Sequence, residues 1–176
     1  MSKFEQLVDA GRYGDTERVQ QLLDEGVPID SVDEWGRCAL YLACQYERAA
    51  TASLLMQRGA DVNIQLPMDN GGEFPLYWAS MKGMTATVQE LLDHGAIVDM
   101  KTRDGNTALK VACQFGQLET ALLLVAHNAW DDAIDDGTFD WAMSTTSREE
   151  AQERLLQARR DYKRHQPRIK PARSVD

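Results

Sequence analysis

The chain has 176 residues and a hydrophobic content of 43%, which is enough apolar material for one folded domain and too much for an intrinsically disordered protein. Its formal net charge of −9 argues against binding to nucleic acid phosphates. No apolar run approaches the roughly 18 residues of a transmembrane helix, and the first residues do not form a signal peptide. We therefore expect a protein of the cytoplasm or the nucleus.

The chain begins with two predicted helices, around residues 4–12 and 16–25. The second helix ends at Gly26, and Pro28 cannot continue it. Because the first helix begins directly at the start of the chain, no room is left for a turn ahead of it. Residues 1–32 are therefore expected to form an N-terminal cap with a polar outer face, on which nothing stacks.

After this cap, two kinds of marker residue recur at matching distances. Helix-stop residues are spaced by 33, 36 and 33 positions, and turn glycines by 36, 33 and 32. The longer step in both series indicates one insertion of three residues between Asn63 and Gly72, and divides the chain into units of about 33–65, 66–101, 102–134 and 135–157. The helix stops are Gly26, Gly59, Gly95 and Asn128, and the turn glycines are Gly36, Gly72, Gly105 and Gly137.

Each complete unit carries two short stripes of apolar residues at the helical spacing i, i+3 and i+4. The first stripe contains small residues, which let that helix approach its neighbours closely. The second stripe contains Leu and Met. In the unit 33–65 the two stripes are Leu40, Ala43, Cys44 and Ala52, Leu55, Met56.

These residues resemble the ankyrin repeat family, whose signature is a turn followed by T-P-L-H-x-A, a second helix and G-A-D-V-N. The chain reads DEWGRCALYLA to GADVN, then DNGGEFPLYWA to GAIVD, then TRDGNTALKVA to NAWDD. The resemblance covers about residues 4–157. It implies that residues 1–157 form an all-α, ankyrin-type solenoid of stacked helix-turn-helix units with projecting β-hairpin fingers.

The chain departs from the family signature at the start of each first helix. Of the three residues at the Thr position, only Thr107 can supply an oxygen that caps the helix, a contribution of ~1 kcal/mol. Tyr41, Tyr77 and Lys110 replace the family's His, whose side-chain bonds tie one turn to the next. We therefore expect a less rigid array than an idealised one.

The C-terminal part changes character. The unit 135–157 is shortened and is expected to be a degenerate cap. Residues 159–176 contain 7 Lys or Arg and 2 acids, whereas the remaining residues contain 12 and 26. Residues 158–176 are thus expected to be a basic tail, made of a fraying helix and a disordered end. This tail is either a solvated terminus or a targeting signal.

The sequence offers no catalytic or metal-binding constellation. Five aspartates gather near Asp135 and Asp136, but their spacing does not match a calcium loop. No CxxC pair exists, and Cys44 and Cys113 occupy equivalent positions two units apart, too far for a disulfide. We expect reduced thiols, no cofactor and no enzymatic activity.

The resemblance also implies where a partner binds, because family members usually contact partners through the finger tips and the exposed ends of the first helices. The last exposed positions of these helices are Tyr13, Tyr46, Lys82 and Phe115, three of them aromatic. Trp35 stands at a finger tip, where it either packs under the next finger or awaits a partner. The expected partner-binding residues are Tyr13, Trp35, Tyr46, Met81, Lys82, Arg103 and Phe115, with Asp135 and Asp136 attracting a basic segment.

The sequence therefore predicts a non-enzymatic protein-interaction module, an adaptor, scaffold or inhibitor, that acts as a monomer through its concave face and finger tips. The alternative is a structural subunit that assembles through an open end of the array and the C-terminal tail. Asn63 occupies a position at which the resemblance implies hydroxylation in some family members.

Overall fold

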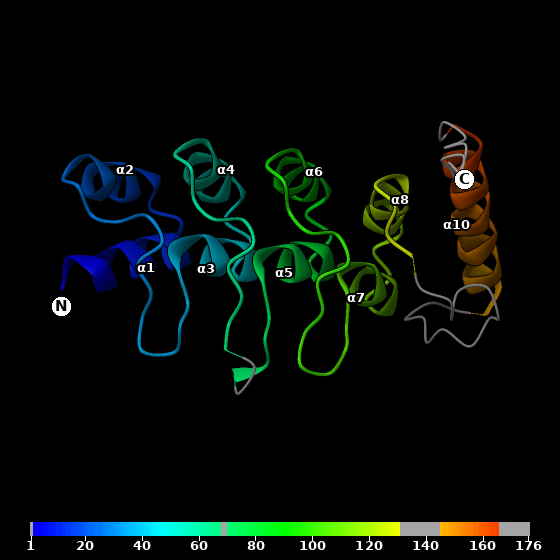
Figure 1. The fold of residues 1–176 in the computed structure, drawn as a ribbon, viewed down its shortest axis with the longest axis horizontal. Helices are drawn as coiled ribbons and strands as arrows, with labels where there is room; N and C mark the ends of the chain where they lie inside the picture. The colour runs from blue at the N-terminus through cyan, green and yellow to red at the C-terminus, as the bar shows by residue number, and fades with distance from the viewer. Residues whose placement is uncertain (1, 68–69, 131–144, 166–176) are drawn as a thin grey trace, which may run out of the picture.

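The structure is a computed structural model that describes residues 2–67, 70–130 and 145–165. Its helices lie in two parallel rows, with the first helix of each unit in one row and the second helix in the other (Figure 1). The first row contains α1 (Lys3–Tyr13), α3 (Ala39–Gln45), α5 (Pro75–Met81) and α7 (Ala108–Gln114). The second row contains α2 (Thr16–Asp24), α4 (Ala49–Gln57), α6 (Thr85–Asp93) and α8 (Leu118–Ala126), and α10 (Thr145–His165) follows at the C-terminal end.

This arrangement confirms the predicted helix-turn-helix solenoid. The loops between units project from the first row, on the side away from the second row (Figure 1). β-pairing in these fingers is slight: in the part of the chain that the structure describes, one isolated bridge joins Val32 to Cys38. The other fingers close through a few backbone hydrogen bonds, such as Thr102 N to Asn106 O at 3.0 Å.

Local sequence explains where the first helices begin. Ser2 and Glu5 form a capping box on α1, in which each side chain accepts a hydrogen bond from the backbone N–H of the other. The Thr107 hydroxyl caps α7 as predicted, accepting from Lys110 N at 3.1 Å. The Cys38 sulfur takes the same role on α3, which a search for cap oxygens did not anticipate.

The small residues of the first row pack as their pattern predicts. Leu40, Ala43 and Cys44 are at most 1% exposed, and so are Leu109, Ala112 and Cys113 two units later. α1 and α3 approach each other closely at Gly11. A Cβ added to Gly11 would lie 2.5 Å from the carbonyl oxygen of Ala39, so this helix crossing accepts no side chain at position 11.

A residue with a left-handed backbone follows shortly after the end of each of the helices α2, α4, α6 and α8. Asn128, at φ 70°, takes the role that Gly26, Gly59 and Gly95 fill in the other units. This confirms the prediction that Asn replaces the helix-stop glycine there, because Asn tolerates the left-handed region better than most other side chains do.

The expected loss of ties between turns is wrong at Tyr41. Its hydroxyl donates a hydrogen bond to the Glu73 carboxylate at 2.7 Å and accepts one from Trp78 Nε1 at 2.8 Å. The side chain is buried, and burial together with the bond to Glu73 raises its pKa. A tyrosine thus links unit 33–65 to unit 66–101 in place of the family's histidine.

The second half of the last unit is a long helix. Ala151 and Leu155 of α10 are fully buried, α10 lies against α8 (Figure 1), and Arg154 pairs with Glu119 of α8 at 2.9 Å. The helix continues past the expected domain end at 157 to His165. Residues 135–144, with Gly137, Asp135 and Asp136, and residues 166–176 of the basic tail lie outside the described residues. Among the helices described, none is long and apolar enough to span a bilayer.

Candidate protein-binding surface

Four predicted partner residues form one line along the array. Tyr13 is the last residue of α1, and Tyr46, Lys82 and Phe115 are the C-cap residues of α3, α5 and α7. We call these four the helix-end column. Its aromatic members are exposed large side chains: Tyr13 is 67% exposed, Phe115 51% and Tyr46 36%.

A left-handed residue follows each member of this column and turns the chain sharply into the second helix. Three of these residues are glycines, Gly14, Gly83 and Gly116, with φ of 80°, 67° and 71°. The fourth is Glu47, whose φ of 60° is unfavourable for a residue with a Cβ. The turns are alike, so the column is presented at regular intervals by the backbone.

Contacts between units connect three members of the column. The Arg12 guanidinium lies 5.6 Å from the ring centroid of Tyr13 and 5.0 Å from that of Tyr46. Lys82, at the end of α5, forms an ion pair at 3.4 Å with Glu47, the left-handed residue that follows α3. Tyr13, Tyr46 and Lys82 are therefore neighbours through contacts as well as through sequence position.

Met81 offers less surface than the prediction assumed. Its side chain is only half exposed, like those of Gln45 and Gln114 at the equivalent positions. Its carbonyl accepts a hydrogen bond from Gln117 Nε2 at 3.4 Å. Met81 thus presents less surface to a partner than Lys82, the exposed residue that follows it.

The structure shows how Trp35 lies at its finger tip. Its carbonyl accepts a hydrogen bond from Asn70 Nδ2 of the next finger at 3.2 Å, but its side chain is 52% exposed. The Arg37 guanidinium lies 4.5 Å from the ring centroid and is also paired with Asp33 at 2.7 Å. The backbone of this finger packs, whereas the indole ring remains on the surface.

The remaining predicted residues are not gathered at the helix-end column. Arg103 is exposed in a separate finger, where its backbone N–H donates to Gly71 O at 2.9 Å. Asp135 and Asp136 lie outside the described residues. Asn63 is half-buried, and its amide bridges two units by donating to Gly95 O at 3.1 Å and accepting from Ile97 N at 2.8 Å.

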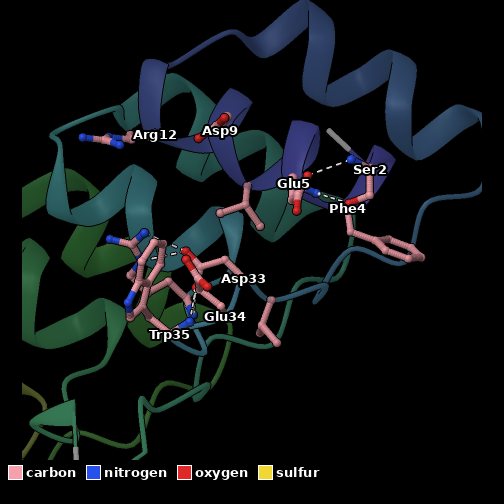
Figure 2. Close-up of a pocket in the computed structure, with 11 residues that line it drawn as sticks. Ser2, Phe4, Glu5, Asp9, Arg12, Asp33, Glu34 and Trp35 are labelled. Carbon is pink, nitrogen blue, oxygen red and sulfur yellow. Dashed lines mark hydrogen bonds and ion pairs between the residues drawn. The ribbon is translucent and has the colours of Figure 1, made fainter.

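Sequence reasoning missed a groove between α1 and the finger 32–37, with a volume of about 420 Å³. Figure 2 shows Glu5, Asp9 and Arg12 of α1 above the finger that carries Glu34 and Trp35. We call this cavity the N-terminal groove. No sequence pattern indicates it, because the groove depends on how α1 lies against the finger of the next unit.

Nothing in the described residues resembles a catalytic centre. The three cysteines are buried, and burial raises the pKa of the Cys38 thiol to about 11, which disfavours the reactive thiolate. His94 and His127 each place Nδ1 near the backbone carbonyl four residues earlier, at 2.8 and 3.0 Å. Within the described ranges, no group of His, Cys, Asp or Glu side chains has the arrangement of a metal site.

The fold and the surface define a class: stacked helix-turn-helix repeats that present exposed aromatic side chains along the ends of the first helices. A family model described as ankyrin repeats in three copies matches residues 7–66 and 60–135. The chain belongs to the ankyrin repeat family, whose repeats generally mediate protein-protein interactions.

Several known proteins resemble the chain. It is 34% identical over 127 residues to XBAT34 of Arabidopsis thaliana, a candidate E3 ubiquitin-protein ligase. That match covers 72% of this chain and 34% of XBAT34. It is 29% identical over 128 residues to Neurogenic locus notch homolog protein 2 of Homo sapiens, covering 72% and 5%. It is 30% identical over 118 residues to the ankyrin repeat protein YahD of Escherichia coli K12, covering 67% and 57%. The chain spans less than two thirds of each of these relatives.

Proposed function

We propose that the chain is a non-enzymatic interaction module, an adaptor, scaffold or inhibitor, that binds a protein partner through its concave face and finger tips. The single observation that carries this proposal is the exposure of Tyr13, Tyr46 and Phe115 at equivalent turns of successive units. Packing within the array does not require an aromatic ring at an exposed helix end.

The physical argument concerns free energy of association. An aromatic ring buries a large area on binding and has few rotatable bonds to immobilise, so it stabilises a complex at a low entropic cost. The left-handed turns hold the backbone of each column member in one conformation. Lys82 adds a cation to the column, and Trp35 adds a further exposed ring at a finger tip.

The test is a double substitution, Tyr46→Ala with Phe115→Ala. We expect the variant to lose partner capture from a cell lysate, measured by mass spectrometry of proteins retained on the immobilised chain. Its melting temperature should change little, because neither side chain belongs to the buried core. Ile97→Ala is the matched control, since Ile97 is 55% exposed but lies outside the column. Equal capture by the double variant would refute the concave-face proposal.

A second candidate is a structural subunit that assembles end to end. Its supporting observation is a charge difference between the ends: residues 1–32 contain 7 acids and 3 Lys or Arg, whereas residues 159–176 contain 2 and 7. Light scattering during size-exclusion chromatography separates the two proposals. A monomer supports the interaction module, and an oligomer that dissociates when the chain ends at His165 supports the subunit.

The proposed module uses no cofactor and acts in the cytoplasm or the nucleus. Asn63 is proposed as a hydroxylation site, although the modifying enzyme would have to open both hydrogen bonds of its amide to units downstream. Intact mass of the protein from its own cells tests this, because one added oxygen is easily detected. Fluorescence microscopy of the tagged chain tests the location.

A further inference from the structure

We infer that the N-terminal groove binds an extended basic segment of the protein partner, with an apolar side chain in the groove and Lys or Arg side chains at its acidic edge. This inference rests on the proposed function and adds the chemistry of the bound segment. The segment would lie between α1 and the finger 32–37, next to the helix-end column.

The groove lies on one face of the finger 32–37, and another finger covers the other face. On that other face the next finger packs closely: a Cβ on Gly36 would lie 2.9 Å from the ring of Pro67, and Asn70 Nδ2 donates to Trp35 O. The groove itself runs between the finger and α1, which contributes Phe4, Val8 and Arg12 to its lining. A partner segment can therefore lie along the finger on the side of α1.

The electrostatics of the groove favour a cationic segment. Asp9 and Glu34 have no ion-pair partner among the described residues, and Glu5 accepts only the backbone N–H of Ser2. Two cations also line the groove: Arg37 is paired with Asp33, another lining residue, and Arg12 lies over the ring of Tyr46. Three carboxylates thus remain available at the groove, and a bound Lys or Arg would pair with them.

The apolar side chains of the groove favour a hydrophobic residue in the same segment. Phe4 is 50% exposed, Val32 47% and Trp35 52%, and buried Val8 lies beneath them on α1. Figure 2 shows the rings of Phe4 and Trp35 on opposite sides of the groove. Exposed apolar side chains grouped around a cavity mark interaction sites, and about 420 Å³ accommodates one or two large side chains.

The groove is continuous with the helix-end column, because Arg12 lines the groove and its guanidinium also contacts Tyr13 and Tyr46. A partner that covers the column can extend its chain into the groove without leaving the surface. The same chemistry, an apolar residue between cations, occurs in Arg168-Ile169-Lys170 of this chain, so the basic tail of the protein is the competing occupant that the experiment must separate.

The experiment selects 12-residue random peptides displayed on phage against the immobilised full chain, and measures binding of the most enriched peptide by isothermal titration calorimetry. We expect enrichment of peptides with Lys or Arg beside Leu, Ile or Trp. Asp9→Asn with Glu34→Gln should weaken binding by about tenfold, because each exposed ion pair contributes up to ~1 kcal/mol. Glu17→Gln, an exposed acid of α2 outside the groove, should leave binding unchanged.

The inference would be overturned by no enrichment, by enriched peptides without cations, or by equal binding of the Asp9 and Glu34 variant. Peptides recovered only from a chain that ends at His165 would assign the groove to the protein's own tail and would also overturn it. The Phe115→Ala variant should retain full peptide binding, because Phe115 does not line the groove. The proposal for the helix-end column is therefore tested by partner capture, and the proposal for the groove by peptide binding, so that one can fail without the other.

Discussion

Replacing Gly11 by Ala sets two effects of opposite sign against each other. In a helix, Ala is favoured over Gly by roughly 0.5–1 kcal/mol, so helix propensity alone predicts a more stable protein. The added Cβ, however, would lie 2.5 Å from the carbonyl oxygen of Ala39 and 2.7 Å from its Cα. Both are backbone atoms, which cannot rotate away, so α1 must move from α3 as a whole.

Overpacking of this kind costs roughly 1–3 kcal/mol, and a clash with backbone places the cost near the upper end of that range. After subtraction of the gain in helix propensity, we expect Gly11→Ala to lower the free energy of unfolding by about 2 kcal/mol. The melting temperature should then fall by about 4–8 °C for a chain of this length. Urea unfolding followed by circular dichroism measures the change.

Ser80→Ala is the matched control, because Ser80 occupies the position equivalent to Gly11 two units later. Its buried hydroxyl has no hydrogen-bond partner among the described residues, and an unsatisfied buried group costs about 1–3 kcal/mol. Alanine should therefore raise the stability of the protein at position 80 and lower it at position 11. A Gly11→Ala variant as stable as the parent would refute the close approach of α1 and α3.

Three further predictions concern backbone strain, a bridge between units and alkaline pH. Glu47→Gly should be more stable than Glu47→Ala by ~1 kcal/mol, because both lose the exposed pair with Lys82 but only Gly relieves the left-handed backbone; equal urea midpoints would contradict this. Asn63→Asp should lower the free energy of unfolding by ~1 kcal/mol, because a carboxylate can still accept from Ile97 N but cannot donate to Gly95 O. Urea unfolding of both proteins measures the change. An unchanged midpoint would argue against the hydrogen bond from Asn63 to Gly95 O. The pKa of Tyr41 is raised in the folded state, so the stability that Tyr41 contributes should be complete below the ordinary Tyr pKa of about 10 and should decline as the pH rises above it. Urea midpoints should therefore fall less steeply with pH in Tyr41→Phe than in the parent. Parallel curves for the two proteins would exclude a contribution of Tyr41 to the pH dependence.

The period and the helices could be predicted from the sequence because they depend on short-range rules. Apolar residues at i, i+3 and i+4 define the buried side of a helix, and glycine or asparagine marks a left-handed turn wherever it occurs. Asn128 illustrates this, since its role followed from its place in the series of helix stops. The aromatic residues of the helix-end column were predicted for the same reason, because position within a repeat determines position along the array.

Tertiary structure alone decided the features that join residues of different units. The bond from Tyr41 to Glu73, the exposed ring of Trp35, the limited exposure of Met81 and the N-terminal groove all depend on which atoms of one unit meet those of the next. Side-chain conformation and the distance between stacked helices determine such contacts, and neither is a property of a single repeat. The sequence by itself therefore determined the array and the line of side chains it displays, whereas packing between units determined which of them are exposed and which carboxylates remain unpaired beside them.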